Sequence, residues 1–398
     1  MFMKILAINS GSSSLKFSLF DMDNESVIAS GIFERIGLES GSYTIKYKGE
    51  KVREVMPISD HNEAVRLLFD KLITLNIIDS LDDIDGIGHR ILHGKDFYKE
   101  SVIIDDEVLN NLNKLIDLGP LHMHANISGI EAFREAVPNT PNVGVFDTAF
   151  HQSMDKATYM YPVPYSWYEK YGIRKYGFHG TSHRYIASEV EKLLGRKEYK
   201  LISCHIGSGA SICAIKDGKC VDTSMGFTPL AGVMMGTRSG DVDPSIIPYV
   251  MEKEGKNASE IVNSLNKDSG LVGLSEYSSD MRDILSRCDE NDEKAILARD
   301  KFVRRIVDYI AQYFVLLGGC DIIVFTAGIG ENSVSIRREV CEALNVLGVK
   351  IDLDANQKRG ELVKISTDES KIEVYVVPTD EELMIARDTL NLIRNGNN

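Results

Sequence analysis

Apolar and polar positions along the chain form short blocks that predict strands and helices in alternation. An apolar run at residues 5–8 stops at a Gly/Ser turn, and partial alternation resumes at residues 15–20, which is the pattern of a β-hairpin. The polar stretch 42–55 fits surface strands. Buried strands are predicted at 84–91 and 142–146, and helices at 62–75, 107–118 and 128–137. This alternation indicates an α/β fold.

A second strand–turn–strand block follows about 200 residues after the first. It consists of an apolar run at 201–206, the turn Gly207-Ser208-Gly209 and a second run at 210–216. The two blocks share a pattern but few identities, which predicts an internal duplication. Further on, the pattern predicts an amphipathic helix, a strand, a loop and a helix at 300–317, 321–325, 326–332 and 333–347.

Composition limits the classes of function. The 398 residues predict two to three domains at about 150 residues each. With 45 basic and 59 acidic residues the net charge is −14, which argues against nucleic-acid binding but permits a local basic pocket for a small anion. No apolar run approaches the roughly 18 residues of a membrane-spanning helix, and the N-terminal run is too short for a signal peptide. The six cysteines form no C-x-x-C motif, so we expect a reduced cytoplasmic protein.

Three Gly/Ser loops, each after a predicted buried strand, are candidates for phosphate binding. The first, residues 9–16 (NSGSSSLK), offers hydroxyl and N–H donors and the charge of Lys16, without Walker A spacing. The second is 205–209 (HIGSG), and the third is 328–332 (GIGEN), which precedes a predicted helix. Each loop alone fits an ordinary polar turn equally well. Three such loops together favour a nucleotide.

Three arginines lie where a guanidinium fork can meet carboxylate or phosphate oxygens. Arg90 ends a predicted strand, Arg238 lies in a Gly-flanked loop, and Arg282 follows Asp280 by two residues. The alternative for each is a surface ion pair. Gly-flanked turns in an acidic protein weigh against that alternative.

Asp147 and His179 are further candidates for chemistry. Asp147 directly follows the strand 142–146, a common catalytic position in α/β folds, although a helix N-cap would also place it there. His179 and His183 are four residues apart, but the motif lacks the Glu of H-E-x-x-H. A hydrogen-bonding histidine at a loop is therefore favoured over a zinc ligand.

Together these segments resemble the acetate kinase family of short-chain acyl kinases over nearly the whole chain. The matching stretches are 9–17 (NSGSSSLKF), 88–94, 146–151 (FDTAFH), 176–183 (YGFHGTSH), 236–244 (GTRSGDVDP), 325–332 (FTAGIGEN) and 378–387 (PTDEELMIAR). YGFHGTSH and FTAGIGEN are specific to the short-chain acyl kinases.

The resemblance implies two duplicated actin-like (ribonuclease H-like) α/β domains with the active site in the cleft between them. The first would comprise 1–150 and the C-terminal helix 383–398 and bind the acyl substrate; the second, 151–382, would bind the nucleotide. The implied reaction is reversible in-line transfer of the ATP γ-phosphoryl group to acetate, giving acetyl phosphate and ADP. The resemblance also implies Mg²⁺, or Mn²⁺ in its place, and a homodimer with neither nucleic-acid nor membrane partners.

The resemblance assigns roles residue by residue. The implied catalytic residues are Arg90, Asp147, His179 and Arg238, and the implied metal-site residues are Asn9 and Glu381. The implied acyl pocket comprises Arg90, Leu92, Leu121, His122, Phe178 and Pro229. The implied nucleotide-binding residues are Ser12, Ser14, Lys16, His205, Ile206, Gly207, Ser208, Gly209, Asp280, Met281, Arg282, Gly328, Ile329, Gly330, Glu331 and Asn332. A carboxylate acceptor is already ionised at neutral pH, so Asp147 is expected to orient an arginine or a metal-bound water rather than act as a base.

Several positions depart from the family pattern. Ser208 replaces the usual Asn, His122-Met123-His124 replaces His-Asn-Pro, and Asp380 replaces Asn. Leu92 replaces the usual Val, which narrows the acyl pocket by about one methylene and favours acetate or formate over propionate or butyrate.

Three alternatives stay open. The first is a kinase of another short acid, such as formate or propionate. The second is a pyrophosphate-dependent acetate kinase, against which Gly328 and Ile329 argue because they leave room for adenosine. The third, more remote, is a non-metabolic nucleotide-dependent binding protein of the actin and chaperone superfamily.

Overall fold

The computed structural model describes residues 3–396, except for the side chains of Pro120 and Leu121. The chain divides into two compact units. Unit 1 comprises the chain through Phe150 and again from Asp380 onward, and unit 2 comprises His151–Thr379. The return to unit 1 falls slightly before residue 383, where the sequence analysis placed it, because the last helix already begins at Glu381.

Unit 1 contains a mixed eight-stranded sheet in the order β5-β4-β3-β2-β1-β6-β8-β7. Its strands are β1 (Lys4–Gly11), β2 (Ser14–Asp21), β3 (Ser26–Glu34), β4 (Ser42–Tyr47), β5 (Glu50–Val55), β6 (Gly86–Ile91), β7 (Val102–Ile103) and β8 (Asn142–Phe146). The expected hairpin is confirmed, since β1 and β2 pair antiparallel across a turn at Ser12 and Ser13. On its other side β1 pairs parallel with β6, and β6 pairs parallel with β8.

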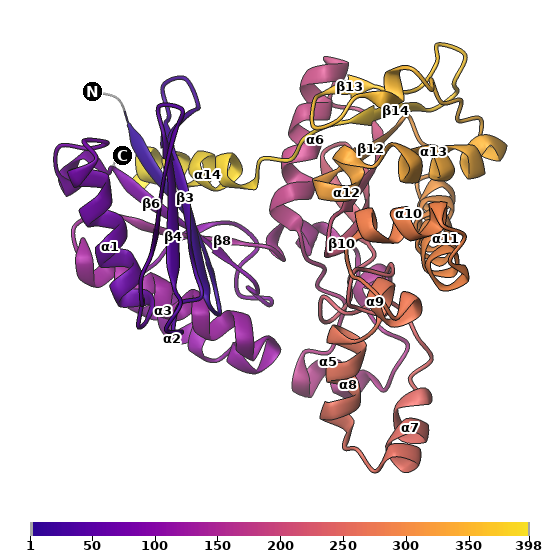
Figure 1. The fold of residues 1–398 in the computed structure, drawn as a ribbon, viewed down its shortest axis with the longest axis horizontal. Helices are drawn as coiled ribbons and strands as arrows, with labels where there is room; N and C mark the ends of the chain where they lie inside the picture. The colour runs from indigo at the N-terminus through magenta and orange to yellow at the C-terminus, as the bar shows by residue number, and fades with distance from the viewer. Residues whose placement is uncertain (1–2, 397–398) are drawn as a thin grey trace. The chain divides into compact units, whose positions relative to one another are not determined.

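Helices cover both faces of this sheet (Figure 1). Side chains of β6 alternate between the faces: His89 makes a T-shaped ring contact with Phe133 of α3 (Pro120–Ala136), on one face of the sheet. Gly88 faces Ile385 and Thr389 of α14 (Glu381–Gly396), on the other face. The α3 side also carries α1 (His61–Thr74). The C-terminal helix α14 therefore completes the core of the N-terminal unit.

Two helix predictions in unit 1 need correction. The helix expected at 128–137 begins at Pro120, since proline is tolerated at a first helical position and has the required φ. The helix expected at 107–118 is split into α2 (Asp106–Asn113) and a short 3₁₀ turn at Ile116–Leu118.

Unit 2 repeats the strand plan of unit 1. Its six-stranded sheet has the order β11-β10-β9-β12-β14-β13. The strands are β9 (Lys200–Ile206), β10 (Ala210–Lys216), β11 (Lys219–Thr223), β12 (Ile322–Thr326), β13 (Val363–Lys364) and β14 (Glu373–Val376). The central strand β9 pairs antiparallel with β10 and parallel with β12, as β1 does with β2 and β6. The predicted internal duplication is thus present as a repeated topology.

Some helices of unit 2 pack on this sheet, whereas α7 (Ile246–Glu254), α8 (Ala258–Lys267) and α9 (Gly270–Ser275) lie in the segment 246–275. The helix α6 (Gly180–Leu194) packs on β9, and α11 (Glu293–Leu316) packs on β9 and β10. The others are α4 (Lys156–Tyr159), α5 (Tyr165–Tyr171), α10 (Met281–Asp289), α12 (Ala327–Asn332) and α13 (Val334–Ala343). The helix expected to start at 300 starts at Glu293, where the Asp292 carboxylate accepts N–H bonds from Lys294 and Ala295.

The segment 326–332, expected as a loop, is mostly the short helix α12. The Glu331 carboxylate accepts the N–H of Ala327 at 2.8 Å, which stabilises the first turn. Two glycines disguised this helix, since glycine lowers helix propensity.

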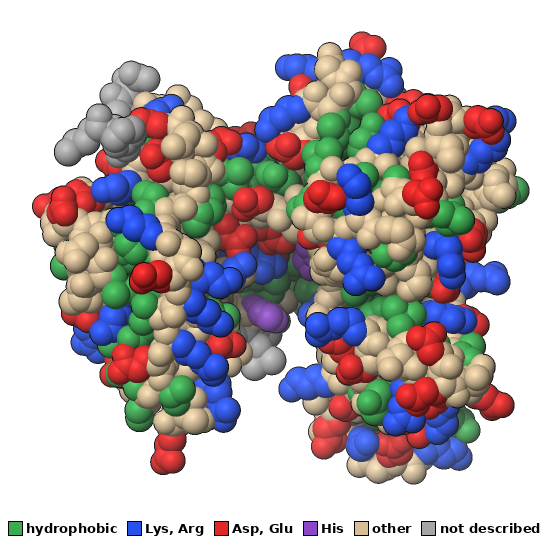
Figure 2. Space-filling model, turned by 45° about the horizontal axis from the view of Figure 1, so that its top comes forward, with side chains coloured by type: hydrophobic (Ala, Val, Ile, Leu, Met, Phe, Trp, Pro, Cys, Tyr) green, Lys and Arg blue, Asp and Glu red, His purple; other side chains and the backbone are tan. Residues whose placement is uncertain are grey.

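The surface carries mixed charges. On the face shown in Figure 2, Lys and Arg side chains lie interspersed with Asp and Glu on both units. Among residues 3–396, no helix combines the length and apolar character needed to cross a membrane.

Candidate functional site

Unit 1 brings Arg90 and Asp147 together at the carboxyl edge of its sheet. Arg90 lies near the end of β6, and Asp147 directly follows β8, the neighbouring parallel strand. Arg90 Nη2 donates to Asp147 Oδ2 at 2.7 Å, and Arg90 Nε donates to Oδ1 at 3.0 Å. The Asp147 side chain is only 1% exposed. The Asp147 carboxylate therefore accepts hydrogen bonds from the Arg90 guanidinium and does not cap a helix N-terminus.

Acidic groups of the last helix adjoin this pair. Glu381 Oε2 lies 3.9 Å from Arg90 Nε. Burial, aided by Asp147 and Glu382, raises the pKa of Glu381 to about 7 against the lowering effect of Arg90. Asp147 in turn is the main cause of a raised pKa for Arg90. Unit 1 thus gathers more buried negative than positive charge here.

The proposed metal residues lie in this same unit. Asn9, on β1, is half-buried and is paired in register with Lys16 on β2, whose ammonium contacts Glu382. Amide and carboxylate oxygens are the hard donors that Mg²⁺ prefers, and Mg²⁺ retains several waters. Burial, and to a smaller extent Asp147 and Glu382, raises the pKa of Glu381, and a bound cation would offset this by stabilising the ionised carboxylate. The donor chemistry therefore fits Mg²⁺.

The acyl-pocket candidates are divided between the units. In unit 1, the half-buried Leu92 packs in a cluster with Met123 and Phe146, and its N–H donates to Asn126 Oδ1 at 3.0 Å. His122 is exposed on α3, and the side chain of Leu121 lies outside what the structure describes.

Phe178 and Pro229, the remaining acyl-pocket candidates, belong to unit 2. Their carbonyls accept hydrogen bonds from His151 Nε2 at 2.9 Å and Arg238 Nη1 at 3.2 Å.

In unit 2, His179 and Arg238 flank the second Gly/Ser loop. A Cβ built at Gly209 would lie 3.6 Å from both Arg238 Nη1 and His179 Nε2. His179 has a left-handed φ of 58° at the start of α6, and its ring stacks on His205 at 4.2 Å between centroids. Arg238 has no acidic partner among residues 3–396, and burial lowers its pKa. A buried arginine without a carboxylate is electrostatically suited to bind an anion.

The two histidines of YGFHGTSH both bond to Ser211. Its hydroxyl contacts His179 Nδ1 at 2.9 Å and His183 Nε2 at 2.7 Å. The other nitrogen of His183 contacts Ser203 Oγ, and burial lowers the pKa of His183 well below its usual value. This geometry supports the hydrogen-bonding interpretation.

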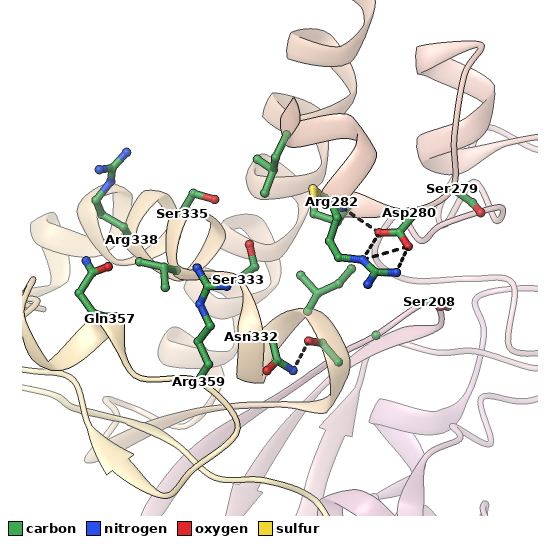
Figure 3. A pocket seen from close by; sticks show the side chains of 16 residues that line it. Ser208, Ser279, Asp280, Arg282, Asn332, Ser333, Ser335, Arg338, Gln357 and Arg359 are labelled. Atoms are coloured by element: carbon green, nitrogen blue, oxygen red, sulfur yellow. Dashed lines mark hydrogen bonds and ion pairs between the residues drawn. The ribbon is translucent and has the colours of Figure 1, made fainter. Parts of the chain in front are cut away.

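A pocket of about 790 Å³ adjoins the second Gly/Ser loop, residues 205–209, and is lined by Gly207 and Ser208 of that loop (Figure 3). Ten of its sixteen lining residues are labelled in the figure, with Asp280 and Arg282 on one side and Gln357 and Arg359 on the other. The predicted nucleotide residues that line it are Gly207, Ser208, Asp280, Met281, Arg282, Gly328, Ile329 and Asn332. A pocket of this size, in the range of small-molecule sites, accommodates a nucleoside.

Other lining residues were missed by sequence reasoning: Ser279, Leu285, Ser333, Val334, Ser335, Arg338, Gln357 and Arg359. Gln357 and Arg359 belong to a segment with no motif, so no sequence signal marked them. Ser333, Val334 and Ser335 directly follow the third loop, and extending that loop by one helical turn would have found them.

Several predicted nucleotide residues do not line the pocket. Ser12, Ser14 and Lys16 belong to the β1–β2 hairpin of unit 1, and His205, Ile206, Gly209, Gly330 and Glu331 lie beside the pocket wall in unit 2. Glu331 Oε1 accepts the N–H groups of Ala327 and Thr379 at 2.8 and 3.1 Å. The Gly330 carbonyl accepts from the fully buried Arg337 at 3.0 Å. These two residues position the third loop.

The fold and these residues define a class of protein. A family model of the acetokinase family matches residues 4–387. The chain belongs to that family.

Particular relatives narrow the comparison. An acetate kinase of Bacillus cytotoxicus is 54% identical, over 98% of both chains. The crystal structure of the Porphyromonas gingivalis acetate kinase matches with a TM-score of 0.94 and 42% identity, over 98% of this chain and 100% of that one. A propionate kinase from Francisella tularensis matches with a TM-score of 0.93 and 39% identity, over the same shares. The expected family and two-domain actin-like fold class are thereby confirmed.

Proposed function

We propose that this protein transfers the γ-phosphoryl group of ATP to the carboxylate of acetate, reversibly, giving acetyl phosphate and ADP. Membership of the acetokinase family and the acetate kinase relatives support this activity. One structural observation carries it furthest: Arg238 and His179 flank Gly209, next to Gly207 and Ser208 of the pocket wall. A nucleotide bound in the pocket can therefore direct its phosphates towards these two side chains.

The acceptor requires no general base. Acetate has a pKa of about 4 to 5, so it is ionised at neutral pH. Asp147 takes the Nε and Nη2 edge of Arg90, while Nη1 forms no hydrogen bond within residues 3–396. The Nη1 side of the Arg90 guanidinium is therefore left for the substrate carboxylate. Asp147 thus orients Arg90, and burial of the Asp147 carboxylate fixes the direction of this contact.

The barrier is the approach of one anion to another. Charge spreads over the equatorial oxygens of the transferring phosphoryl group, and groups that bind those oxygens lower the barrier. Arg238 and His179 are the unit 2 groups assigned to this role, and Ser211 holds the His179 ring through Nδ1 at 2.9 Å. The residues assigned to the transfer come from both units.

Mg²⁺ is the proposed metal, held through Glu381 and Asn9 with waters completing its shell. When bound, it neutralises phosphate charge. Its binding to Glu381 also favours the ionised carboxylate, which burial otherwise disfavours.

The activity is tested by trapping acyl phosphate as hydroxamate. The assay compares Mg-ATP with pyrophosphate as donor, and formate, acetate, propionate and butyrate as acceptors. We expect the highest kcat/KM with ATP and acetate. Highest kcat/KM with propionate, the substrate in the name of the Francisella relative, would leave phosphoryl transfer standing but overturn the choice of acid. Turnover with pyrophosphate but not with ATP would contradict ATP as the phosphoryl donor. If no donor–acceptor pair gave acyl phosphate, the proposal of a kinase would be wrong.

A matched variant tests the acyl pocket. Leu92→Val removes one methylene at the end of β6, and we expect kcat/KM for propionate to rise relative to acetate by about tenfold, since a methylene is worth roughly 10–200-fold in specificity. Leu193→Val on the exposed side of α6 serves as the control. An unchanged ratio of kcat/KM for propionate to kcat/KM for acetate would show that Leu92 does not line the acyl pocket.

A further inference from the structure

A buried group of His151, Cys213 and Cys220 in unit 2 has no role in the proposed reaction. Cys213 lies on β10, Cys220 on β11, and His151 in the 3₁₀ turn Ala149–Ser153. All three side chains are at most 1% exposed. His151 Nδ1 lies 3.2 Å from Cys220 Sγ, and Cys220 Sγ lies 3.5 Å from Cys213 Sγ. The three atoms fall within 4.8 Å of one another.

These separations are close to those of ligands around one metal ion. Zinc–sulfur bonds of about 2.3 Å and zinc–nitrogen bonds of about 2.0 Å place tetrahedral ligand atoms roughly 3.5–3.8 Å apart. The observed distances of 3.2 and 3.5 Å differ from this by a few tenths of an ångström. None of the three separations exceeds 4.8 Å.

The histidine is already held in the state that a metal requires. Its Nε2 faces the Phe178 carbonyl at 2.9 Å, and a carbonyl only accepts, so Nε2 carries the proton. In the neutral ring, Nδ1 then carries no proton, and its lone pair is directed at Cys220 Sγ. A second hydrogen bond from the far nitrogen to a carbonyl is the usual support of a metal-binding histidine.

A fourth polar group close to the cluster lacks a partner. Tyr313 of α11 is fully buried, and its hydroxyl forms no hydrogen bond within the part of the chain that the structure describes. Burial raises the pKa of Tyr313, and Asp222, Tyr309, Cys213 and Cys220 add to that effect. The helix α11 that carries Tyr313 packs on β10, the strand of Cys213. A buried hydroxyl without a hydrogen-bond partner calls for an explanation, and a bound ion or water is one such explanation.

We propose that His151, Cys213 and Cys220 bind one thiophilic d¹⁰ cation, Zn²⁺, in a three-ligand Cys₂His site. Binding forms two zinc–thiolate bonds and one zinc–imidazole bond, and the two thiol protons pass to solvent. Two thiolates neutralise the charge of the cation in this buried setting. Thiolate and imidazole ligands select zinc over the oxygen-preferring Mg²⁺ of the phosphoryl-transfer reaction.

The site would crosslink three parts of unit 2. It ties the β10–β11 hairpin to His151, the first residue of the unit, and His151 contacts Phe178, which precedes His179. Zinc is therefore expected to raise the unfolding temperature of the protein.

The test uses the full chain, reduced and freed of metal with a chelator. Cd²⁺ is titrated as the probe, and the ultraviolet charge-transfer band of cadmium–thiolate bonds is followed together with proton release. We expect saturation at one Cd²⁺ per chain with release of two protons, and reversal on adding Zn²⁺. X-ray absorption of the zinc form should give two sulfur ligands. Absence of a saturable one-equivalent band, or zinc with another number of sulfurs, would overturn the proposal.

Variants assign the ligands. Cys213→Ala and Cys220→Ala should each abolish the stoichiometric band and the thermal shift caused by zinc. Cys204→Ala removes an equally buried thiol, on β9, and should retain both. Equal binding by the Cys213→Ala/Cys220→Ala double variant would refute the assignment. If those variants fail to fold, the wild-type sulfur count decides the question.

Discussion

Two arginines assigned to the reaction lie in opposite electrostatic surroundings. Arg90 is bonded to Asp147 and lies near Glu381. Replacing Arg90 by alanine would leave the buried Asp147 unpaired, at a cost of roughly 3–5 kcal/mol in stability. Arg238 forms no ion pair with a carboxylate in the part of the chain that the structure describes, so its removal leaves no buried carboxylate unpaired, and burial disfavours its charge. The effect of Arg238 on rate can therefore be measured without a large effect on folding.

We predict that Arg238→Ala lowers kcat by about 10³–10⁵-fold, the range for a transition-state arginine in phosphoryl transfer. Its unfolding free energy should stay near that of wild type. The hydroxamate assay measures the first quantity and urea unfolding the second. Arg304→Ala, at an exposed position of α11, is the control. Turnover of Arg238→Ala at the wild-type rate would contradict its role.

His89 links stability to pH. It is 2% exposed, its Nε2 lies 2.7 Å from Asn142 Oδ1, and burial lowers its pKa to about 4. The unfolded chain protonates this histidine below about pH 6.5, whereas the folded chain does so only below about pH 4. The unfolded state therefore binds more protons in this window, and stability falls as pH decreases through it.

We predict that His89→Gln, which keeps a hydrogen-bonding group but cannot titrate, reduces this loss. The difference in unfolding free energy between variant and wild type should change by up to about 3 kcal/mol between pH about 6.5 and about 4. Urea unfolding across that range measures it. Parallel pH curves for the two proteins would show that His89 makes no such contribution.

At the scale of elements, the close packing of α14 on the sheet depends on two glycines of β6. A Cβ at Gly86 would lie 2.2 Å from Ile393 Cδ1, and one at Gly88 would lie 2.3 Å from Thr389 Oγ1. The helix thus approaches β6 more closely than a larger residue permits. It also positions Glu381 beside Arg90, so this packing supports the site as well as the core.

We predict that Gly88→Ala destabilises the protein by about 1–3 kcal/mol, the usual cost of overpacking. Gly396→Ala, at the end of α14, is the control, since the nearest neighbour of its added Cβ would be Ile103 Cδ1 at 3.6 Å. Chemical unfolding of both variants measures the difference. Equal stability would show that the helix shifts without cost.

At the scale of the whole molecule, one strand plan is used twice for different purposes. In unit 1 the carboxyl edge of the sheet carries Arg90, Asp147 and, from α14, Glu381. In unit 2 the loop between β9 and β10 and the segment after β12 line the 790 Å³ pocket. The repeated topology places loops alike, and the side chains on those loops set the chemistry.

We predict that Mg-ADP slows hydrogen exchange mainly in unit 2, at segments 207–208, 279–285, 328–338 and 357–359, because these line the pocket. Exchange in the β4–β5 hairpin should not change. Mass spectrometry of peptides with and without nucleotide measures both. Protection confined to unit 1 would reverse the proposed roles of the two units.

The sequence alone determined the parts of this protein that local chemistry encodes. Short apolar runs, each followed by a Gly/Ser turn and a second run, predicted β1, β2, β9 and β10, and the recurrence of this pattern predicted the duplication. Motif residues after strands marked Arg90 and Asp147 as separate candidates, and the Gly/Ser loops and Asp280 to Arg282 predicted eight of the sixteen residues that line the pocket. That Arg90 and Asp147 pair with each other became visible only in the sheet, where β6 and β8 run parallel side by side.

Tertiary structure decided what depends on contacts between distant segments. Gly328 and Gly330 hide the short helix α12, which Glu331 stabilises. No pattern near Gln357 or Arg359 indicated that they would face Arg282 across a pocket. Likewise, His151 lies more than sixty residues before Cys213, and only packing of the β10–β11 hairpin brings their side chains together. Local patterns specify elements, whereas burial of those elements against one another chooses which side chains meet.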